Sequence, residues 1–116
     1  MNGESCDLAD KSCVPCRGGV PPLSEAEREP LLAALGPNDW NVVDGHHLAK
    51  EYKFPDFASA LAFVNRIGAI AEAEGHHPDL TLGWGRVGVA TWTHKIDGLT
   101  ESDFVLAAKI ERALAA

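Results

Sequence analysis

Residues 79–94, DLTLGWGRVGVATWTH, carry the clearest pattern in the chain. A β-branched residue occupies every second position of its second half, namely Val87, Val89, Thr91 and Thr93. Such alternation is typical of a strand with one buried face, and it places His94 at the strand end on the opposite face. With residues 79–84 as the partner strand and a turn near Gly85, the stretch predicts a β-hairpin.

A second hairpin is predicted upstream. Residues 40–43 and 48–53 are short strand-like runs, and the dipeptide Asp44-Gly45 separates them. This dipeptide suits a tight turn because both residues tolerate a positive φ. Two hairpins of antiparallel strands favour a four-stranded antiparallel sheet.

Helix signals flank and separate the hairpins. Ser24-Glu25-Ala26-Glu27 has the capping-box pattern and begins a first helix that ends near Gly36. Pro30 lies inside this helix and predicts a kink or a late start, because it lacks a backbone donor. The segment Thr100-Glu101-Ser102-Asp103 begins the last helix in the same way as the first.

The longest helix follows Pro55-Asp56 and ends at Gly75, which suits a left-handed C-cap ahead of Pro78. It carries a wide apolar face whose main stripe is Phe57, Leu61, Val64, Gly68 and Ala71, with Phe63, Ile67 and Ile70 beside it. The predicted element order is α-β-β-α-β-β-α. We therefore expect an α+β fold, in which three helices return to the same side and pack on one face of a four-stranded antiparallel sheet.

Residues 1–22 lack both helical and alternating periodicity, and they contain Cys6, Cys13 and Cys16. We interpret them as an extended, flexible arm ahead of a domain at 23–116. Cys13 and Cys16 form a CxxC pair, which is compatible with redox chemistry or half of a zinc site. No second cysteine pair and no following helix supports those uses, so we interpret the thiols as incidental.

Composition and charge limit the classes of function. The chain has 116 residues, is 46% hydrophobic, and fits one globular domain. Its formal net charge of −7 disfavours direct binding to nucleic acid or to a membrane surface. Three cysteines, no long apolar run and no secretory signal lead us to expect a cytoplasmic protein without a disulfide framework.

The residues best suited to chemistry are His76-His77 at a helix end and His94 at a strand end. Histidine exchanges protons near neutral pH, so histidines around one cleft suit general acid-base catalysis. Glu72 lies four residues before His76 and could orient its ring if the helix persists. Two alternatives are histidines on a surface loop and a metal site. Adjacent histidines seldom chelate one ion, so we expect no bound metal.

These residues resemble the signature of the pterin-4a-carbinolamine dehydratases. The match consists of Glu72, His76-His77-Pro78, Trp84, His94 and Asp103 at the family's spacing. The segment 93–100, THKIDGLT, is also similar to the family's pattern of Thr-His, a spacer and Gly-Leu-Thr. The similarity extends from about Leu23 to the C-terminus and includes Trp40.

The resemblance implies a hydro-lyase, 4a-hydroxytetrahydrobiopterin dehydratase, that uses neither metal nor organic cofactor. Its substrate would be 4a-hydroxytetrahydropterin and its product quinonoid dihydropterin, which recycles the pterin consumed by aromatic amino-acid hydroxylases. Family members form homodimers or homotetramers. We expect such an assembly to use the apolar face of the 56–75 helix and unpaired sheet edges.

The resemblance also implies roles for single residues. His76 would be the leading acid-base group, His94 its complement across the pocket, and His77 a residue that binds and positions the pterin. Glu72 would orient His76, and Pro78 belongs to the same binding group. The remaining signature residue, Asp103, either serves the site or completes a helix cap.

Two tryptophans, Trp84 and Trp40, could stack on a flat pterin or pack across strands. His46-His47 lies outside the signature, and we interpret this pair as solvated surface.

Other functions remain open on this fold. Relatives include proteins that stabilise dimers of a homeodomain transcription factor and proteins linked to the assembly of a carbon-fixing enzyme, so a dimeric binding or assembly factor is one alternative. A dehydratase acting on another pterin is a second, because nothing in the sequence reads the substituent at C6. The presence of His76, His77 and His94 favours catalysis.

Overall fold

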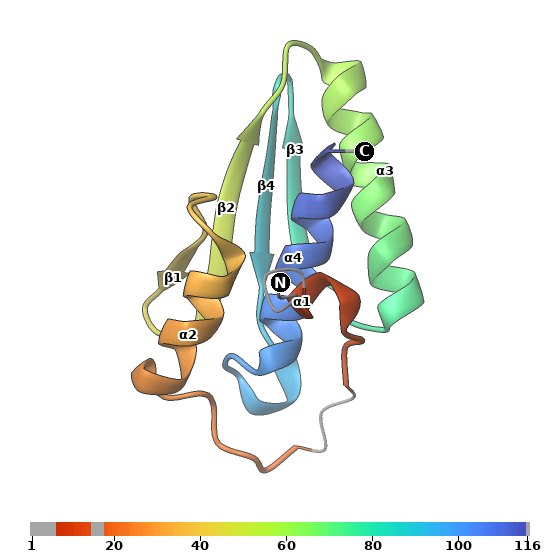
Figure 1. Cartoon of the computed structure of the whole chain (residues 1–116). Helices are drawn as coiled ribbons and strands as arrows, with labels where there is room; N and C mark the ends of the chain where they lie inside the picture. The colour runs from red at the N-terminus through yellow and green to blue at the C-terminus, as the bar shows by residue number, and fades with distance from the viewer. Residues whose placement is uncertain (1–6, 15–17, 116) are drawn as a thin grey trace.

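The computed structural model describes residues 7–14 and 18–115. One antiparallel sheet has the strand order β1-β2-β4-β3 (Figure 1). Its strands are β1 (Asn41–Val43), β2 (His47–Lys53), β3 (Asp79–Gly83) and β4 (Arg86–Thr91). Three longer helices lie on one face of this sheet: α2 (Glu25–Leu35), α3 (Phe57–Glu74) and α4 (Glu101–Ala115). The predicted α+β fold is confirmed.

Both predicted hairpins are confirmed. Asp44 and Gly45 have φ angles of 54° and 64° in the turn between β1 and β2, which the sequence anticipated from their tolerance of positive φ. The two hairpins join through the β2 and β4 pair, which runs in register from Leu48 opposite Thr91 to Lys53 opposite Arg86. The antiparallel β3 and β4 pair, with Asp79 opposite Ala90, places the end of β4 at the same end of the sheet as the start of β3.

The predicted strand that reached His94 is too long. Strand β4 ends at Thr91, and His94 begins a short 3-10 helix, η2 (His94–Ile96). The reason is a tight loop: Thr93 N donates to Gly98 O at 2.8 Å, and Gly98 N donates back to Thr93 O at 3.3 Å. His94 therefore projects from a turn and not from a pleated strand.

The first helix begins as the sequence predicts. Ser24 and Glu27 form the reciprocal capping box at the start of α2. The alternative of a late start is wrong, because α2 begins at Glu25 and continues through Pro30.

The buried face of α3 is shifted from the predicted main stripe toward the apolar residues predicted beside it, Phe63 and Ile67. Its buried residues are Ala60, Phe63, Ile67 and Ala71. Phe63 packs against Tyr52 and Phe54 of the β2 end at ring-centroid distances of 4.8 and 5.3 Å. This large side chain sets the rotation of the helix and leaves Phe57 44% and Leu61 40% exposed.

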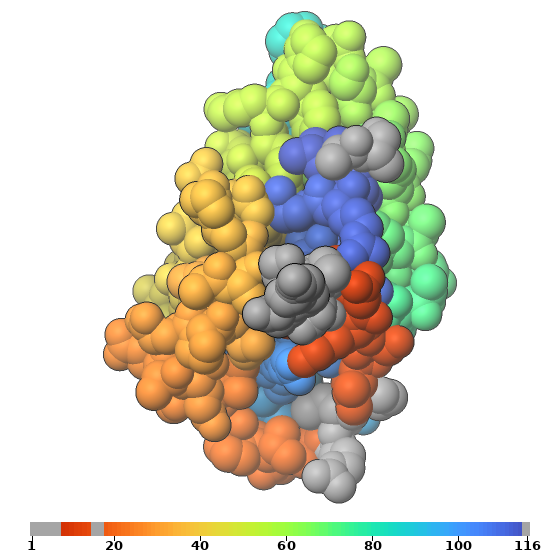
Figure 2. Space-filling view, in the orientation of Figure 1, coloured from red at the N-terminus to blue at the C-terminus, as the bar shows by residue number. Residues whose placement is uncertain are grey.

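The N-terminal segment is helical where an extended arm was predicted. Residues Asp7–Asp10 form the short helix α1, whose Leu8 belongs to the core. A helix of four residues is too short to show a periodic pattern in the sequence, so periodicity could not predict it. Lys109 Nζ of α4 donates to Ala9 O at 2.8 Å, and Figure 2 shows the N-terminal residues, in red, packed against α4, in blue.

Two further predictions concern the ends of the chain and the membrane. Cys6 and Cys16 lie outside the described residues, and the division into an arm at 1–22 and a domain at 23–116 stays a prediction. Among the helices of the described part, none is long and apolar enough to cross a membrane.

Candidate active site

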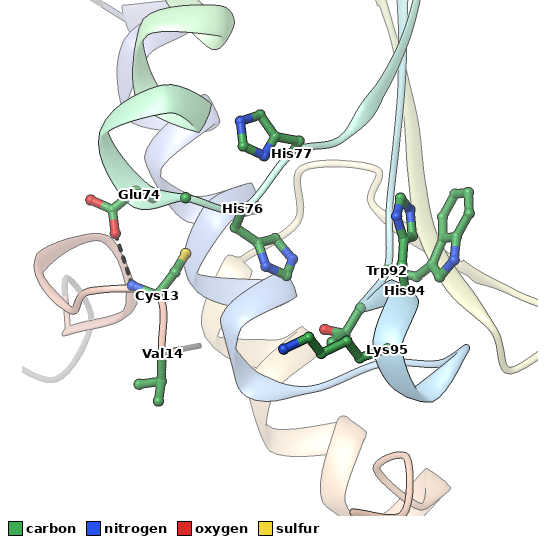
Figure 3. A pocket seen from close by; sticks show the side chains of 10 residues that line it. Cys13, Val14, Glu74, His76, His77, Trp92, His94 and Lys95 are labelled. Carbon is green, nitrogen blue, oxygen red and sulfur yellow. Dashed lines mark hydrogen bonds between the residues drawn. The ribbon is translucent and has the colours of Figure 1, made fainter. Parts of the chain in front are cut away.

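A pocket of about 340 Å³ opens at the end of the sheet where β4 finishes and β3 begins. Its volume is within the range of small-molecule sites. Its lining comes from three places in the chain (Figure 3), namely Cys13 and Val14, Glu74 to His77, and Trp92 to Lys95. His76, His77 and His94 thus meet in one pocket.

The C-terminus of α3 delivers the histidine pair. Gly75 adopts the left-handed conformation, with φ 66° and ψ 28°, and its N–H donates to Ala71 O at 2.9 Å. Only glycine adopts this conformation at little cost. The chain therefore leaves the helix sharply, and His76 and His77 enter the pocket before Pro78 leads into β3.

Asp103 holds His76 from inside the protein. Its side chain is fully buried, and its Oδ1 lies 2.6 Å from His76 Nε2. A carboxylate at this distance accepts a hydrogen bond, so Nε2 carries the proton of this contact. This arrangement leaves Nδ1 of His76 to exchange a proton with a molecule in the pocket.

The same carboxylate also supports the opposite wall. Thr93 Oγ1 donates to Asp103 Oδ2 at 2.9 Å, and Thr91 Oγ1 donates to Oδ1 at 2.8 Å. Thr93 directly precedes His94. The buried carboxylate of Asp103 therefore holds His76 directly, and it holds the backbone beside His94 through the side chain of Thr93.

The two roles weighed for Asp103 in the sequence coexist. Thr100 N donates to Asp103 Oδ2 at 3.0 Å, which is the backbone contact of a helix cap at the start of α4. The contact with His76 uses the other oxygen. Asp103 thus both caps α4 and contacts His76.

Glu72 does not orient His76, contrary to the expectation from their spacing. The helix ends at Glu74 and the left-handed Gly75 turns the following residues away. Glu72 Oε2 lies 2.7 Å from Nε2 of His77, and both side chains are largely exposed. Glu72 therefore contacts His77, the second histidine of the pair, and not His76.

A cluster of rings surrounds His94. The ring of Trp92 lies 4.6 Å from that of His94, and the rings of His46 and His47 lie 5.1 and 5.8 Å from that of Trp92. His46 also contacts Asp97, with 2.7 Å between Nε2 and Oδ1. The interpretation of His46-His47 as solvated surface is therefore wrong, because both side chains are half-buried beside Trp92.

The two tryptophans named from the sequence lie away from the pocket. Trp84 is 73% exposed in the turn between β3 and β4, at the far end of the sheet. Trp40 is buried, and its Nε1 donates to Glu111 Oε2 at 2.9 Å. The aromatic side chain that lines the pocket is Trp92.

Sequence reasoning missed several site residues. Trp92 and Lys95 line the pocket on either side of His94, and their closeness to His94 in the sequence was the available signal. Thr91 and Thr93 appeared only as members of a buried strand face. Their hydrogen bonds to Asp103 depend on tertiary packing between β4 and α4, which periodicity does not report.

Cys13 occupies the remaining side of the pocket. Burial, together with the nearby negative charge of Glu74, raises the pKa of the Cys13 thiol to about 12. The hydrogen bond from Cys13 N, 2.8 Å long, in turn holds the pKa of Glu74 below its ordinary value. The thiol is therefore protonated at neutral pH. Within residues 7–14 and 18–115, no three His, Cys, Asp or Glu side chains are grouped to hold a metal ion.

Comparison with known proteins shows which family the chain belongs to. A family model described as pterin 4 alpha carbinolamine dehydratase matches residues 21–113. The chain belongs to this family. A relative from Rickettsia bellii, provisionally named pterin-4-alpha-carbinolamine dehydratase, is 59% identical over 92% of this chain and 94% of its own length.

Solved structures agree with this membership. A transcriptional coactivator/pterin dehydratase from Brucella melitensis is 34% identical, with a TM-score of 0.73 over 79% of this chain and 97% of its own. A pterin dehydratase-like protein identified as a RuBisCO assembly factor in the alpha-carboxysome is 22% identical, with a TM-score of 0.57 over 66% of this chain and 90% of its own. The second likeness extends to the fold alone.

Proposed function

We propose that this protein removes water from 4a-hydroxytetrahydropterin by histidine acid-base catalysis and so returns quinonoid dihydropterin to a tetrahydropterin cycle. Family membership supports the coarser statement that it is a pterin carbinolamine dehydratase, which is a hydro-lyase. The observation that carries the finer proposal is the pocket in which His76, backed by buried Asp103, and His94 lie together.

The reaction needs two proton transfers. The C4a–O bond breaks when the hydroxyl oxygen gains a proton and leaves as water, while N5 loses its proton and the C4a=N5 double bond forms. One group must supply a proton and another must accept one, and two imidazoles on facing walls can do both. His76 is the leading candidate and His94 its complement.

The remaining pocket residues would bind the pterin. His77 lies beside His76 on the same wall, and Trp92 offers an aromatic ring on the wall of His94. Offset stacking of a flat heterocycle on an aromatic ring is worth about 0.5–1.5 kcal/mol. We assign the acid-base steps to the His76 and His94 pair and the positioning of the substrate to His77 and Trp92.

The test follows dehydration of freshly generated 4a-hydroxytetrahydropterin by rapid absorbance, after subtraction of the spontaneous rate in matched buffer. Removal of a general acid or base typically costs roughly 10² to 10⁴ in rate. We expect the wild type to accelerate the reaction, and His76→Ala and His94→Ala each to lose at least about tenfold of that acceleration. The variant Lys53→Ala is the control, because the Lys53 side chain is 79% exposed, pairs with Arg86 at the opposite end of the sheet and does not line the pocket.

Two results would contradict parts of this proposal. A wild-type rate equal to the buffer rate would remove this substrate and favour an assembly factor or a dehydratase for another pterin. Equal losses in Lys53→Ala and His76→Ala would remove the assigned roles. A role in pterin recycling further predicts that the protein raises the steady-state rate of an aromatic amino-acid hydroxylase when pterin is limiting.

A further inference from the structure

Two residues of the N-terminal segment, Cys13 and Val14, form a wall of the pocket that the acid-base mechanism does not use. We call these two residues the strap. Cys13 N donates to Glu74 Oε1 at 2.8 Å, and Cys13 Sγ lies 3.5 Å from Ser102 O. Val14 N donates to Ser102 Oγ at 2.8 Å, and the same hydroxyl donates to Val14 O at 3.3 Å. The strap is therefore attached through its backbone at both residues.

The residues that hold the strap are neighbours of those that build the active site. Ser102 directly precedes Asp103, which holds His76. Glu74 is the last residue of α3 and lies two positions before His76. The ends of α3 and α4 therefore fix the position of the strap relative to the histidines.

The strap differs in chemistry from the other walls. The Cys13 thiol is neutral at neutral pH, because burial raises its pKa to about 12. Val14 is an apolar side chain that is 69% exposed beside the pocket. The facing wall carries Trp92, His94 and Lys95, which are aromatic or bear polar and charged groups. The strap is thus the uncharged, aliphatic side of the site.

The structure of the substrate indicates which atoms would meet this wall. The reacting atoms C4a and N5 must lie at the histidines, and C6 is bonded directly to N5. With N5 placed at His76, a substituent at C6 lies next to the wall that adjoins His76, which is the strap. The carbon atoms of such a substituent pack more favourably against Val14 and a neutral thiol than against the amino group of Lys95, whereas any hydroxyl on it requires a polar partner.

We propose that the strap contacts the C6 substituent of the pterin and sets which substituents the enzyme accepts. Ser102 and Glu74 are positioning residues that hold the strap in place. This inference rests on the proposed dehydratase function, and it assigns a role to a segment outside the family signature.

The first test changes the size of the wall. Val14→Trp is compared with the wild type on two 4a-hydroxytetrahydropterins that differ only at C6, one with a methyl group and one with a dihydroxypropyl chain. A single methylene in a fitted pocket changes kcat/KM by roughly 10- to 200-fold. We expect Val14→Trp to lower kcat/KM for the longer substrate at least about tenfold more than for the methyl substrate. Leu114→Trp, at an exposed leucine near the end of α4, is the matched control and should leave the ratio unchanged.

The second test loosens the attachment of the strap. Ser102→Ala removes the hydroxyl that holds Val14, whereas Ser102→Thr keeps a hydroxyl. We expect Ser102→Ala to raise KM for the longer substrate more than it lowers kcat, and Ser102→Thr to restore the wild-type KM at least in part. Circular dichroism and thermal unfolding check that each variant remains folded.

The outcomes separate this inference from the proposed function. A wild type that accelerates dehydration, with the same substrate ratio in Val14→Trp as in Leu114→Trp, would overturn the role of the strap and leave the dehydratase function intact. A wild type that accelerates neither substrate would overturn both. A loss of kcat/KM in Val14→Trp that is greater for the longer substrate than for the methyl substrate supports the strap as the wall that contacts the C6 substituent.

Discussion

Asp103 is the residue on which most of the site geometry depends. Its Oδ1 accepts from Thr91 Oγ1 and contacts His76, and its Oδ2 accepts from Thr93 Oγ1 and Thr100 N. In Asp103→Asn an amide NH₂ would face two of these donors. An unsatisfied buried donor costs about 1–3 kcal/mol, so we expect a loss of stability of this size in urea unfolding, together with at least a tenfold loss of dehydratase rate.

Glu72→Gln provides the comparison for this prediction. Glu72 contacts His77 at the protein surface, where an ion pair contributes roughly 0–1 kcal/mol. Its effect on stability should therefore be several-fold smaller than that of Asp103→Asn. Equal stability losses in the two variants would show that the buried hydrogen bonds of Asp103 contribute no more to stability than the surface contact of Glu72.

The raised pKa of Cys13 predicts a thiol of low reactivity. Alkylation requires the thiolate, and at pH 8 a thiol with a pKa of about 12 is almost entirely protonated. The higher intrinsic nucleophilicity of such a thiolate offsets only about half of this deficit on a logarithmic scale. In a Cys6→Ser, Cys16→Ser background, iodoacetamide should modify Cys13 roughly tenfold or more slowly than an unfolded control peptide, and the rate should rise with pH beyond pH 9. Rapid labelling at pH 8 would contradict a buried, neutral thiol.

At the scale of the element, the C-terminal end of α3 determines the direction in which His76 and His77 leave the helix. Gly75 has a φ angle of 66°, and a Cβ added there would meet no atom within 4 Å. The left-handed backbone conformation, and not a steric clash, therefore disfavours other residues at this position. A left-handed conformation costs other residues about 1–2 kcal/mol. We expect Gly75→Ala to lower the free energy of unfolding by about 1 kcal/mol and to reduce dehydratase activity by displacing His76.

Gly68 offers an opposite substitution in the same helix. It lies inside α3 with ordinary helical backbone, and an added Cβ there also meets nothing within 4 Å. Alanine in a helix interior is more stable than glycine by roughly 0.5–1 kcal/mol. Gly68→Ala should therefore raise the thermal midpoint while Gly75→Ala lowers it. A shift of the same sign in both variants would refute the left-handed cap as the cause.

The elements were predictable from the sequence where local chemistry determines them. The Ser24 capping box, the Asp44-Gly45 turn and the Gly75 cap each depend on a few neighbouring residues, and all three are confirmed. These three features need no knowledge of distant contacts. The family resemblance grouped His76, His77, His94 and Asp103, and the structure places the three histidines around one pocket with Asp103 Oδ1 2.6 Å from His76 Nε2.

The errors have two physical origins, one local and one tertiary. Glu72 was assigned to His76 from helical spacing, but the left-handed turn at Gly75, a local feature, places it against His77. The other errors come from tertiary contacts. Trp92 gains its place in the site from packing against His46 and His47, which the sequence separates from it by more than forty residues. The short helix α1 is likewise held by α4 and not by its own periodicity.

At the scale of the whole molecule, the exposed side of α3 predicts self-association. Phe57 and Leu61 lie one turn apart and remain 44% and 40% exposed, and β1 and β3 are the edges of the sheet. We propose that the protein is a homodimer or homotetramer in which α3 contributes an apolar contact. Light scattering after size exclusion should then give about two or four times the chain mass, and a mass equal to one chain would contradict the proposal.

Leu61→Glu tests which surface holds such an assembly together. Burial of a leucine side chain contributes about 1.5–3 kcal/mol, and a carboxylate at the same place would add a desolvation penalty. Since each symmetric contact contains the residue twice, we expect the dissociation constant to rise at least about a hundredfold, with unchanged circular dichroism. Leu114→Glu changes a similarly exposed leucine on α4 and should keep the wild-type mass. If Leu61→Glu leaves the mass unchanged while Leu114→Glu lowers it, the contact lies on α4; if neither lowers it, the sheet edges β1 and β3 are the surface that joins the subunits.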